Sequence, residues 1–334
     1  MSIGCAVVGF GGRFAMGLHH AKQVMDTPGL HLAAVYDIDP ERREIARQEL
    51  PEVTVHDTYE AVLADPGVDM VILVTPHDTH APMSIAASKA GKHVLTEKVM
   101  CLDVAEADAM IAAAREAGRM LSVYQNRRWD HDYLTVRKVV SSGLLGDVFH
   151  VDSSVNGWWK PSGWRGSRAA GGGMLYDWGA HLFDQVVQMN LPSLPTSVFA
   201  SRAHRVWMDV DVDTQNSVMV LFDNGVTACI DVGCISRTQR SRWLVRGEKG
   251  ALHLPDWDTA TAQVEMNGVL GSLKVEMEKD DWNALYRNVS AHLNEGTELL
   301  VKPEEVRIGV ACIEAAMKSA ERGESVRVEL PALP

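Results

Sequence analysis

Apolar runs alternate with amphipathic stretches over the first part of the chain. Helix-like patterns at Glu41–Leu50, Thr79–Ala90 and Val104–Ala117 separate the runs. Apolar strands separated by helices are typical of βαβ units, which build a parallel sheet. The runs that predict strands are Ile3–Val8, Leu32–Tyr36, Met70–Val74, His93–Leu95 and Met120–Val123.

The pattern changes in the second part of the chain. Strand-like runs follow one another over residues 195–277, where Asp223-Asn224-Gly225 favours a hairpin turn between Ser217–Phe222 and Thr227–Ile235. All nine tryptophans follow residue 128. We therefore predict an α/β protein with a parallel-sheet domain over residues 1–126 and an α/β domain over 127–334 that contains a mostly antiparallel sheet. Helices are expected there at about 175–190, 281–294 and 303–321.

Composition limits the classes of function. The net charge of −12 argues against a nucleic-acid partner, which would need clustered positive charge. No run approaches the about 18 apolar residues of a membrane span, and no basic segment precedes the first apolar run, so we expect neither a membrane segment nor a signal peptide. The five cysteines are scattered without a CxxC pair, which favours a reducing cytoplasm and no metal site.

The first predicted strand leads into a glycine-rich loop that ends at Gly17. Glycine lets the chain turn tightly and lets its backbone approach a pyrophosphate at a helix N-terminus, so the loop predicts a dinucleotide site. Phe14 occupies the place of the third glycine in the usual GxGxxG pattern, and Gly17 would take that role after a short insertion. The residues expected to lie at the pyrophosphate are Gly9, Gly11, Gly12, Arg13 and Phe14.

Asp37 ends the second predicted strand. A carboxylate there can accept hydrogen bonds from the ribose hydroxyls and would repel a 2′-phosphate, which favours NAD over NADP. The alternative is that Asp37 caps the following helix, although Asp39, directly before Pro40, fits the cap position better. Arg42 or Arg43 could still tolerate a phosphate, so NADP stays open.

Two further loops follow predicted strands, at Thr75–His80 and Thr96–Val99. In an open α/β sheet, ligands bind beyond the carboxyl ends of the strands. Both loops are therefore in position to touch the cofactor. Taken alone, His80 would more often start a helix, and Glu97 and Lys98 would more often form a solvated ion pair.

Asp177 and His181 lie four residues apart after the run Gly171-Gly172-Gly173. If this stretch is helical, both side chains project from one face, one turn apart. A carboxylate beside an imidazole is a general base with its orienting group. A histidine alone would more often be a buried, hydrogen-bonded residue, so the hypothesis depends on the dinucleotide signals elsewhere in the chain.

The ordered set of these segments resembles the glucose–fructose oxidoreductase/inositol dehydrogenase/MocA (Gfo/Idh/MocA) family over nearly the whole chain. The family fold is a Rossmann domain followed by an α/β domain with a large, mostly antiparallel open sheet, which agrees with the two patterns above. The resemblance rests on the glycine loop, Thr75-Pro76 with His80, Gly91-Lys92-His93-Val94 leading to Glu97-Lys98, Asn126-Arg127, and Trp164-Arg165 followed by the glycine run, Asp177 and His181.

The resemblance implies roles for these residues. Lys98 would contact the reacting hydroxyl and the nicotinamide region, and Glu97 would bind near the nicotinamide ribose. His181 would be the general base, with Asp177 as its neighbour and a substrate ligand. Further cofactor contacts are expected from Thr75, Pro76, His77, His80 and Asn126, and further substrate contacts from Trp158, Trp164, Arg165 and Tyr176.

One residue departs from the family motif. Val99 replaces the proline of the Glu-Lys-Pro sequence. That proline is commonly preceded by a cis peptide bond, and a cis bond before valine would be costly. We therefore expect the local path that aims Lys98 to differ from that of the family.

These features predict an NAD(P)-dependent oxidoreductase that transfers a hydride between nicotinamide and a secondary hydroxyl of a sugar, cyclitol or sugar derivative. Neutral imidazole would take the hydroxyl proton, and Lys98 would stabilise the alkoxide. By analogy the protein would be a homodimer or homotetramer. One alternative is an NAD-dependent glycoside hydrolase that oxidises a sugar hydroxyl only transiently. The other is a non-catalytic NAD-binding regulatory protein, which would need neither Lys98 nor His181.

Overall fold

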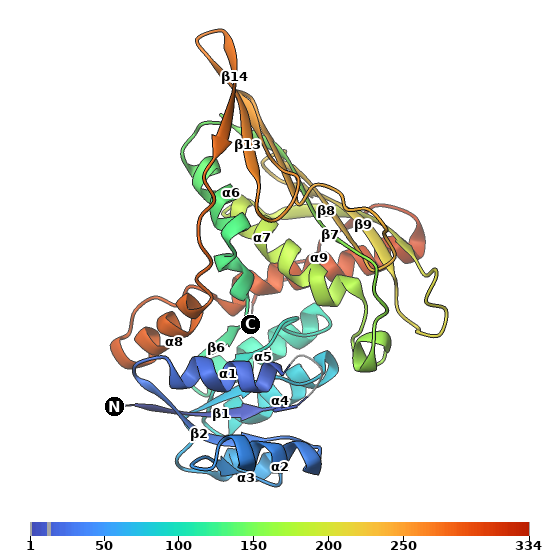
Figure 1. Ribbon diagram of the computed structural model, residues 1–334. Helices are drawn as coiled ribbons and strands as arrows, with labels where there is room; N and C mark the ends of the chain where they lie inside the picture. Colours follow the sequence, from blue (N-terminus) through green and yellow to red (C-terminus); the bar gives the residue numbers. More distant parts are fainter. Residues whose placement is uncertain (1, 12–14, 334) are drawn as a thin grey trace.

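Two sheets organise the molecule. The computed structural model describes residues 2–11 and 15–333 and places a six-stranded sheet and its helices below a nine-stranded sheet in the view of Figure 1. The strand order is β3-β2-β1-β4-β5-β6 in the first sheet and β14-β13-β12-β11-β7-β10-β9-β8-β15 in the second. The predicted fold class is confirmed.

All strand pairs of the first sheet are parallel. β1 and β4 are buried almost throughout, as expected for central strands covered by helices on both faces. The strand order reverses between β1 and β4, so the loops after β1, β4 and β5 meet at the carboxyl edge where such sheets bind ligands. The elements are β1 (Ile3–Val8), α1 (Met16–Met25), β2 (Leu30–Tyr36), α2 (Pro40–Glu49), β3 (Thr54–Val55), α3 (Tyr59–Ala64), β4 (Met70–Leu73), α4 (His77–Lys89), β5 (His93–Thr96), α5 (Val104–Glu116) and β6 (Leu121–Val123).

The second sheet is mostly antiparallel, as predicted. Its described strands pair antiparallel except for β7 with β10. The predicted hairpin joins β9 to β10, with Gly225 at a φ of +84° in the turn. The strands are β7 (Val148–Asn156), β8 (Pro195–Ala203), β9 (Gln215–Phe222), β10 (Thr227–Gly233), β11 (Trp243–Gly247), β12 (Gly250–Leu254), β13 (Ala260–Met266), β14 (Val269–Val275) and β15 (Val326–Arg327).

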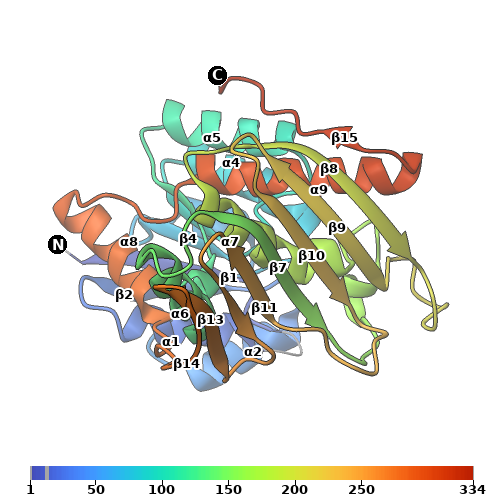
Figure 2. The ribbon, with the colours of Figure 1, turned by 90° about the horizontal axis from the view of Figure 1, so that it is seen from above.

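Helices cover one face of this sheet. α7 packs against β7 and β10, α9 packs against β8, and α6 packs against β12. Figure 2 shows the opposite face, which no helix of the described part of the chain covers. The helical elements are η1 (Asn126–Trp129), α6 (His131–Ser141), η2 (Gly163–Gly166), the π-helical turn η3 (Leu175–Gly179), α7 (Ala180–Asn190), α8 (Asn283–Glu295) and α9 (Pro303–Arg322).

The chain returns to the first domain after the second sheet. α8 packs against α1 and β1, and α9 packs against α5 and β6. The Tyr286 hydroxyl lies 2.6 Å from His20 Nδ1, and Ser290 Oγ donates to the carbonyl oxygen of Pro28 at 2.6 Å. The first domain is therefore completed by residues from near the end of the chain. No helix of the described residues is long and apolar enough to cross a membrane.

Candidate active site

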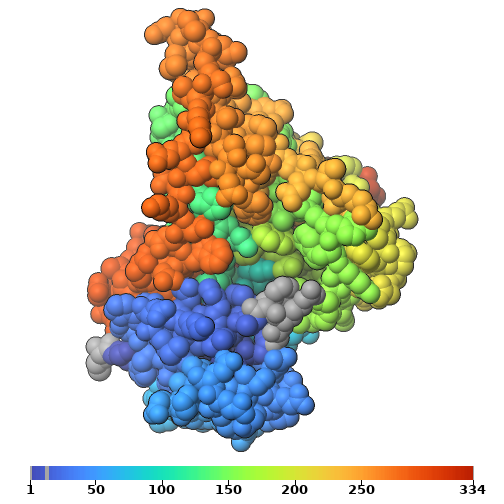
Figure 3. Space-filling view, viewed as in Figure 1, coloured from blue at the N-terminus to red at the C-terminus, as the bar shows by residue number. Residues whose placement is uncertain are grey.

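Lys98 and Asp177 join the two domains beyond the carboxyl end of β5. Lys98 Nζ donates to Asp177 Oδ1 at 2.5 Å and to the Asp177 carbonyl oxygen at 2.9 Å. Arg165 Nε lies 3.6 Å from Asp177 Oδ2. Burial would raise the pKa of the Asp177 carboxyl, but the charges of Lys98 and Arg165 outweigh it and lower the pKa to about 2. The contact is therefore a partly buried ion pair. In the space-filling view the surface is hollowed between the two domains (Figure 3).

The structure does not show the carboxylate–imidazole pair that the four-residue spacing suggested, because Asp177 does not orient the ring of His181. Asp177 lies in the π-helical turn η3, whereas His181 lies in the first turn of α7. The carboxylate points to the cations Lys98 and Arg165. His181 Nδ1 instead lies 3.2 Å from Gln125 Oε1. The π-helical turn and the attraction of the opposite charges separate the two side chains that regular helix spacing would pair.

The contact with Gln125 sets the proton positions on His181. An amide oxygen only accepts, so Nδ1 carries the hydrogen, and the neutral ring then presents the lone pair of Nε2. Burial lowers the pKa of His181 well below 6.5, and the charges of Lys98 and Arg127 lower it further. His181 is therefore a neutral imidazole at physiological pH, with one nitrogen able to accept a proton.

Glu97 is buried and acts on the backbone beside it. Its Oε1 lies 3.0 Å from His20 Nε2, and its Oε2 accepts from the backbone N–H of Lys98 at 2.9 Å. Burial alone would raise the pKa of Glu97, but the hydrogen bond from His20 and the neighbouring charges lower it. Glu97 therefore holds the backbone of Lys98 through an ionised carboxylate.

The loop of Lys98 has the cis geometry that we expected the valine to disfavour. The peptide bond between Lys98 and Val99 is cis. The carbonyl oxygen of Val99 lies 2.7 Å from His80 Nδ1, and that of Thr75 lies 3.0 Å from His80 Nε2. The fully buried ring of His80 thus ties the loop after β4 to the loop after β5.

Asp37 is bound to the glycine loop. Its Oδ2 accepts from the backbone N–H groups of Phe10 at 2.8 Å and Gly11 at 2.9 Å, and its Oδ1 accepts from the N–H of Asp39 at 2.9 Å. The cap of α2 is Asp39, whose side chain accepts from the N–H of Glu41. Asp37 is therefore not the helix cap, and its carboxylate lies at the loop where a dinucleotide would bind.

Gly9 and Gly17 pack too closely against backbone atoms for either to carry a side chain. A Cβ on Gly17 would lie 2.4 Å from the carbonyl oxygen of Gly9, and Gly9 itself has a φ of +98°. This bears out the expected role of Gly17. A Cβ on Gly11 would meet the side chain of Arg42 at 2.4 Å, so Arg42 lies across the loop. The predicted contacts Gly12, Arg13 and Phe14 lie outside the described residues.

Some of the other predicted residues gather around the ion pair. Trp164 packs edge-on against His77 with ring centroids 4.4 Å apart, and the Arg165 guanidinium lies 4.4 Å over the Trp164 ring. His77 Nδ1 lies 2.8 Å from the carbonyl oxygen of Gly171. Trp164, Arg165 and His77 therefore lie together beside Asp177, and the glycine run contacts the start of α4.

Other predicted residues have different neighbours. Trp158 packs against Trp207, and Arg237 lies 3.7 Å over its ring. The Tyr176 hydroxyl donates to the carbonyl oxygen of Leu102 at 3.1 Å, and burial raises the pKa of Tyr176 to about 12. Among the contacts found for the described residues, none joins the side chain of either residue to Lys98, Asp177 or His181. Pro76 precedes α4, Thr75 Oγ1 accepts from Thr79, and Asn126 is buried at the start of η1.

Sequence reasoning missed two neighbours of His181. They are Gln125, its hydrogen-bond partner, and Trp178, whose ring lies edge-on to the imidazole at 6.1 Å. Gln125 follows the last strand of the parallel sheet, and this position at the carboxyl edge was the available signal. Asp184, on α7 with His181, forms a two-point ion pair with the buried Arg128 at 2.8 and 2.7 Å and is structural.

Comparisons with known proteins decide the family. Residues 3–125 match the family model described as the oxidoreductase family with an NAD-binding Rossmann fold, and residues 133–253 match the GFO/IDH/MocA C-terminal domain. The chain belongs to the Gfo/Idh/MocA oxidoreductases. The resemblance drawn from the sequence motifs is confirmed, and the first domain is an NAD-binding Rossmann domain. The glycine backbone and Asp37 fit such a cofactor.

The chain is similar along its sequence to one solved structure and to two scyllo-inositol dehydrogenases. A solved structure of an NAD-binding protein from Listeria innocua is 32% identical with a TM-score of 0.90, and the match covers 98% of this chain and 97% of that one. The scyllo-inositol 2-dehydrogenase (NADP(+)) IolW of Bacillus subtilis (strain 168) is 29% identical over 86% of this chain and 87% of its own. A scyllo-inositol 2-dehydrogenase (NAD(+)) of the same organism is 37% identical, over 42% of this chain and 41% of its own.

Proposed function

We propose that this oxidoreductase oxidises a secondary hydroxyl of a cyclitol, sugar or sugar derivative, or reduces the corresponding ketone. The observation that carries the proposal is the buried neutral imidazole of His181, whose pKa is lowered in part by the nearby charge of Lys98. Both residues lie where the Rossmann sheet would present its cofactor. The names of the two scyllo-inositol dehydrogenases support a cyclitol as the first substrate class to test.

The residues divide the chemistry between them. His181 Nε2 would accept the proton of the hydroxyl, because Nδ1 already carries a hydrogen that points to Gln125. The Lys98 ammonium would stabilise the negative charge on the oxygen as that proton leaves. Asp177 would hold the ammonium in place from the second domain. The bound dinucleotide supplies the hydride acceptor.

The cofactor would be held by residues of three loops. The backbone of Gly9 and Gly11 would face the pyrophosphate, and Asp37 would meet the adenosine ribose while keeping its bonds to the loop. This arrangement favours NAD. Arg42 lies across the loop at Gly11, so a 2′-phosphate would meet a cation there as well as the carboxylate. Glu97 would act near the nicotinamide through the backbone of Lys98.

The substrate would lie against Trp164 and Arg165. An aromatic face suits the C–H face of a sugar or cyclitol ring, and a guanidinium donates hydrogen bonds to hydroxyls or to an anionic substituent. Trp164 is held edge-on by His77 and covered by Arg165, so its position is fixed before any substrate arrives. We assign Trp158 a lesser part, because its ring already packs against Trp207 and Arg237.

The test is a panel of inositols, aldoses and glycosides with NAD and with NADP, in which NADH or NADPH and the organic products are measured together. Accumulation of the reduced cofactor with one equivalent of ketone supports the proposal. Release of sugar from a glycoside without net reduced cofactor would replace it with redox-assisted hydrolysis. Tight NAD binding with no turnover of any compound would favour a regulatory protein.

We also propose that the open face of the large sheet pairs with a second copy of the chain. Phe199, Met219 and Leu221 lie on this face of β8 and β9 and are 46%, 42% and 41% exposed. Adjacent exposed apolar side chains of this size are typical of interaction surfaces. Light scattering should show a dimer or tetramer that Met219→Glu dissociates and Leu270→Glu, a change on the exposed β14, does not. A monomeric wild-type protein would overturn this proposal.

A further inference from the structure

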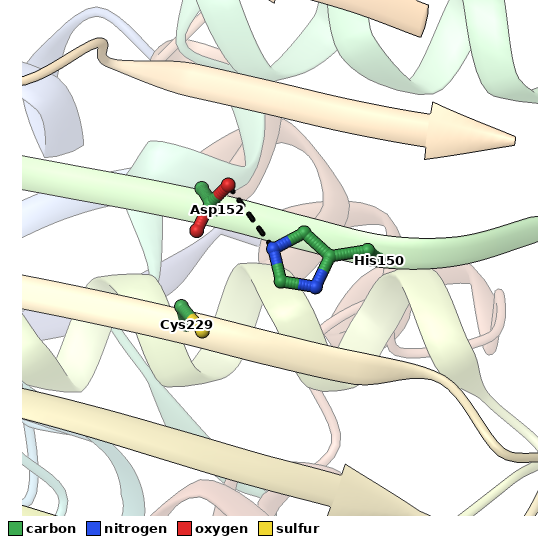
Figure 4. A group of neighbouring side chains, drawn as sticks. All are labelled: His150, Asp152 and Cys229. Carbon is green, nitrogen blue, oxygen red and sulfur yellow. Dashed lines mark ion pairs between the residues drawn. The ribbon is translucent and has the colours of Figure 1, made fainter. Parts of the chain in front are cut away.

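A second cluster of chemically active side chains lies on the open face of the large sheet. His150 and Asp152 come from β7 and Cys229 comes from the neighbouring β10 (Figure 4). One ligand atom of each residue lies within 4.8 Å of those of the other two, and His150 Nε2 is 3.1 Å from Asp152 Oδ2. The proposed oxidoreductase chemistry uses none of these residues.

The sheet itself brings the three side chains together. Residues two apart on a strand point to the same face, which places His150 and Asp152 side by side. The parallel register of β7 and β10 sets Cys229 directly beside Asp152. Both strands are central in the sheet, with a partner on each side. The donor atoms are therefore fixed by paired backbone and not by a mobile loop.

The donor set points to one kind of ligand. An imidazole nitrogen, a carboxylate oxygen and a thiolate sulfur are the three ligand types of zinc sites, and three protein ligands leave a fourth position for water. We propose that His150, Asp152 and Cys229 bind a Zn²⁺ ion. Cys229 would release its proton to solvent on binding, and the thiolate and carboxylate together would neutralise the dication.

The surroundings show both the room for the ion and what opposes it. Asp152 and Cys229 line a cavity of about 170 Å³. Arg246 lies 4.0 Å from Asp152 Oδ2, and Arg240 lies 3.3 Å from Asp231 Oδ2 in the same cavity. These two side chains are 49% and 61% exposed in the single chain, so each can turn away from the cluster when the ion enters. Their charges oppose the cation, which makes Arg246 a residue that should weaken binding. Cys229 is in register with Met219, so the cluster borders the proposed interface between copies of the chain.

An ion bound at this site would stabilise the large sheet and would take no part in the hydride transfer. β7 and β10 are the parallel pair of the large sheet in the described part of the chain, and the ion would bridge them. Binding to the folded state alone raises stability in proportion to the logarithm of the ion concentration above Kd. The proposal therefore rests on neither the substrate nor the cofactor, and it can fail without affecting either.

The experiment uses Co²⁺ as a spectroscopic probe and Zn²⁺ as its competitor, with the full-length, tag-free chain. Co²⁺ should bind one equivalent per chain and give a thiolate-to-cobalt charge-transfer band that Zn²⁺ removes. Cys229→Ser should abolish the band. His150→Gln should weaken binding by at least the about 10–100-fold that loss of an outer-shell partner costs. Arg246→Ala should tighten binding, because it removes a cation beside Asp152.

A matched control lies on the same face. His253→Gln changes a histidine two strands from β7, in register with Leu244 and through it with Asp152, and should leave Co²⁺ binding unchanged. Circular dichroism of each variant keeps a failure to fold apart from a loss of ligands. The proposal is overturned if the wild-type chain gives no charge-transfer band, or if Cys229→Ser retains it.

Discussion

The Asp177 carboxylate accepts a 2.5 Å hydrogen bond from the Lys98 ammonium, and this contact joins the loop after β5 to the π-helical turn before α7. The same lysine donates to the Asp177 carbonyl oxygen, and Glu97 fixes its backbone N–H. Lys98 is therefore held at both ends, its backbone by Glu97 of the first domain and its ammonium by Asp177 of the second.

Asp177→Asn should separate the charge of this contact from its geometry. The amide keeps the shape and leaves the bond to the carbonyl oxygen, but it loses the charge-assisted bond, which contributes about 1.5–3 kcal/mol. We expect kcat/KM to fall by about 10–100-fold, with cofactor affinity nearly unchanged in a fluorescence titration. Asp209→Asn, in the exposed pair with Lys160, is the control and should leave both values as they are. An unaltered kcat/KM in Asp177→Asn would mean that the charge of Asp177 plays no part in the reaction.

Gln125→Glu should change the pH dependence of the reaction. The wild-type His181 has a pKa well below 6.5 because of burial and nearby cations, so kcat/KM should stay level as pH falls through 6.5. A carboxylate at position 125 favours the imidazolium and raises the pKa of His181. The acid limb of kcat/KM should therefore move to higher pH.

Two further variants test the hydrogen bond between Gln125 and His181 without adding a charge. Gln125→Leu removes the acceptor without adding charge, so it should lower kcat without moving the acid limb upward. His181→Asn should lower kcat by the about 10²–10⁴-fold that a general base contributes, and cofactor binding should persist. Identical pH profiles in wild type and Gln125→Glu would mean that another group is the base.

Asp37→Ala should test both tasks of this carboxylate. It removes three hydrogen bonds to the backbone of Phe10, Gly11 and Asp39, so NAD binding should weaken. It also removes the negative charge that would repel a 2′-phosphate. The ratio of kcat/KM with NADP to kcat/KM with NAD should therefore rise. A lower affinity for both cofactors, with an unchanged ratio of the two kcat/KM values, would mean that Asp37 only holds the glycine loop in place.

Acid should destabilise the protein before its carboxylates titrate. Burial, with the charge of Lys98, lowers the pKa of His77 to about 3, and the pKa of His181 also lies well below 6.5. Their unfolded forms bind protons near pH 6.5 and their folded forms do not, so stability is full above about 6.5 and falls as pH decreases toward the folded values. Each contributes a slope of up to roughly 1.4 kcal/mol per pH unit.

Urea unfolding between pH 7 and 4 measures this slope, and His77→Gln should reduce it. Asp177 acts in a different window, because its pKa is lowered to about 2 and its contribution is lost only below about 3.8. If wild type and His77→Gln have the same slope, His77 is not the neutral buried group that the structure describes.

The sequence predicted the Rossmann half closely because its strands are continuous apolar runs. β7 was missed, although it is central in the second sheet, because buried Ser153, Ser154 and Asn156 interrupt its apolar pattern. The motifs named Lys98, Asp177 and His181, but local spacing suggested the wrong pair. Asp177 contacts a lysine 79 positions earlier in the chain, and such a contact depends on how the two domains pack.

The return of α8 to the first domain has a consequence for biosynthesis. Tyr286 and Ser290 contact His20 and Pro28, more than 260 positions earlier in the chain. A nascent chain that stops before Asn283 therefore contains every strand of the parallel sheet but lacks the helix that seals α1 and β1. Because this contact is so distant in sequence, the N-terminal domain cannot complete its packing on the ribosome until α8 has been made.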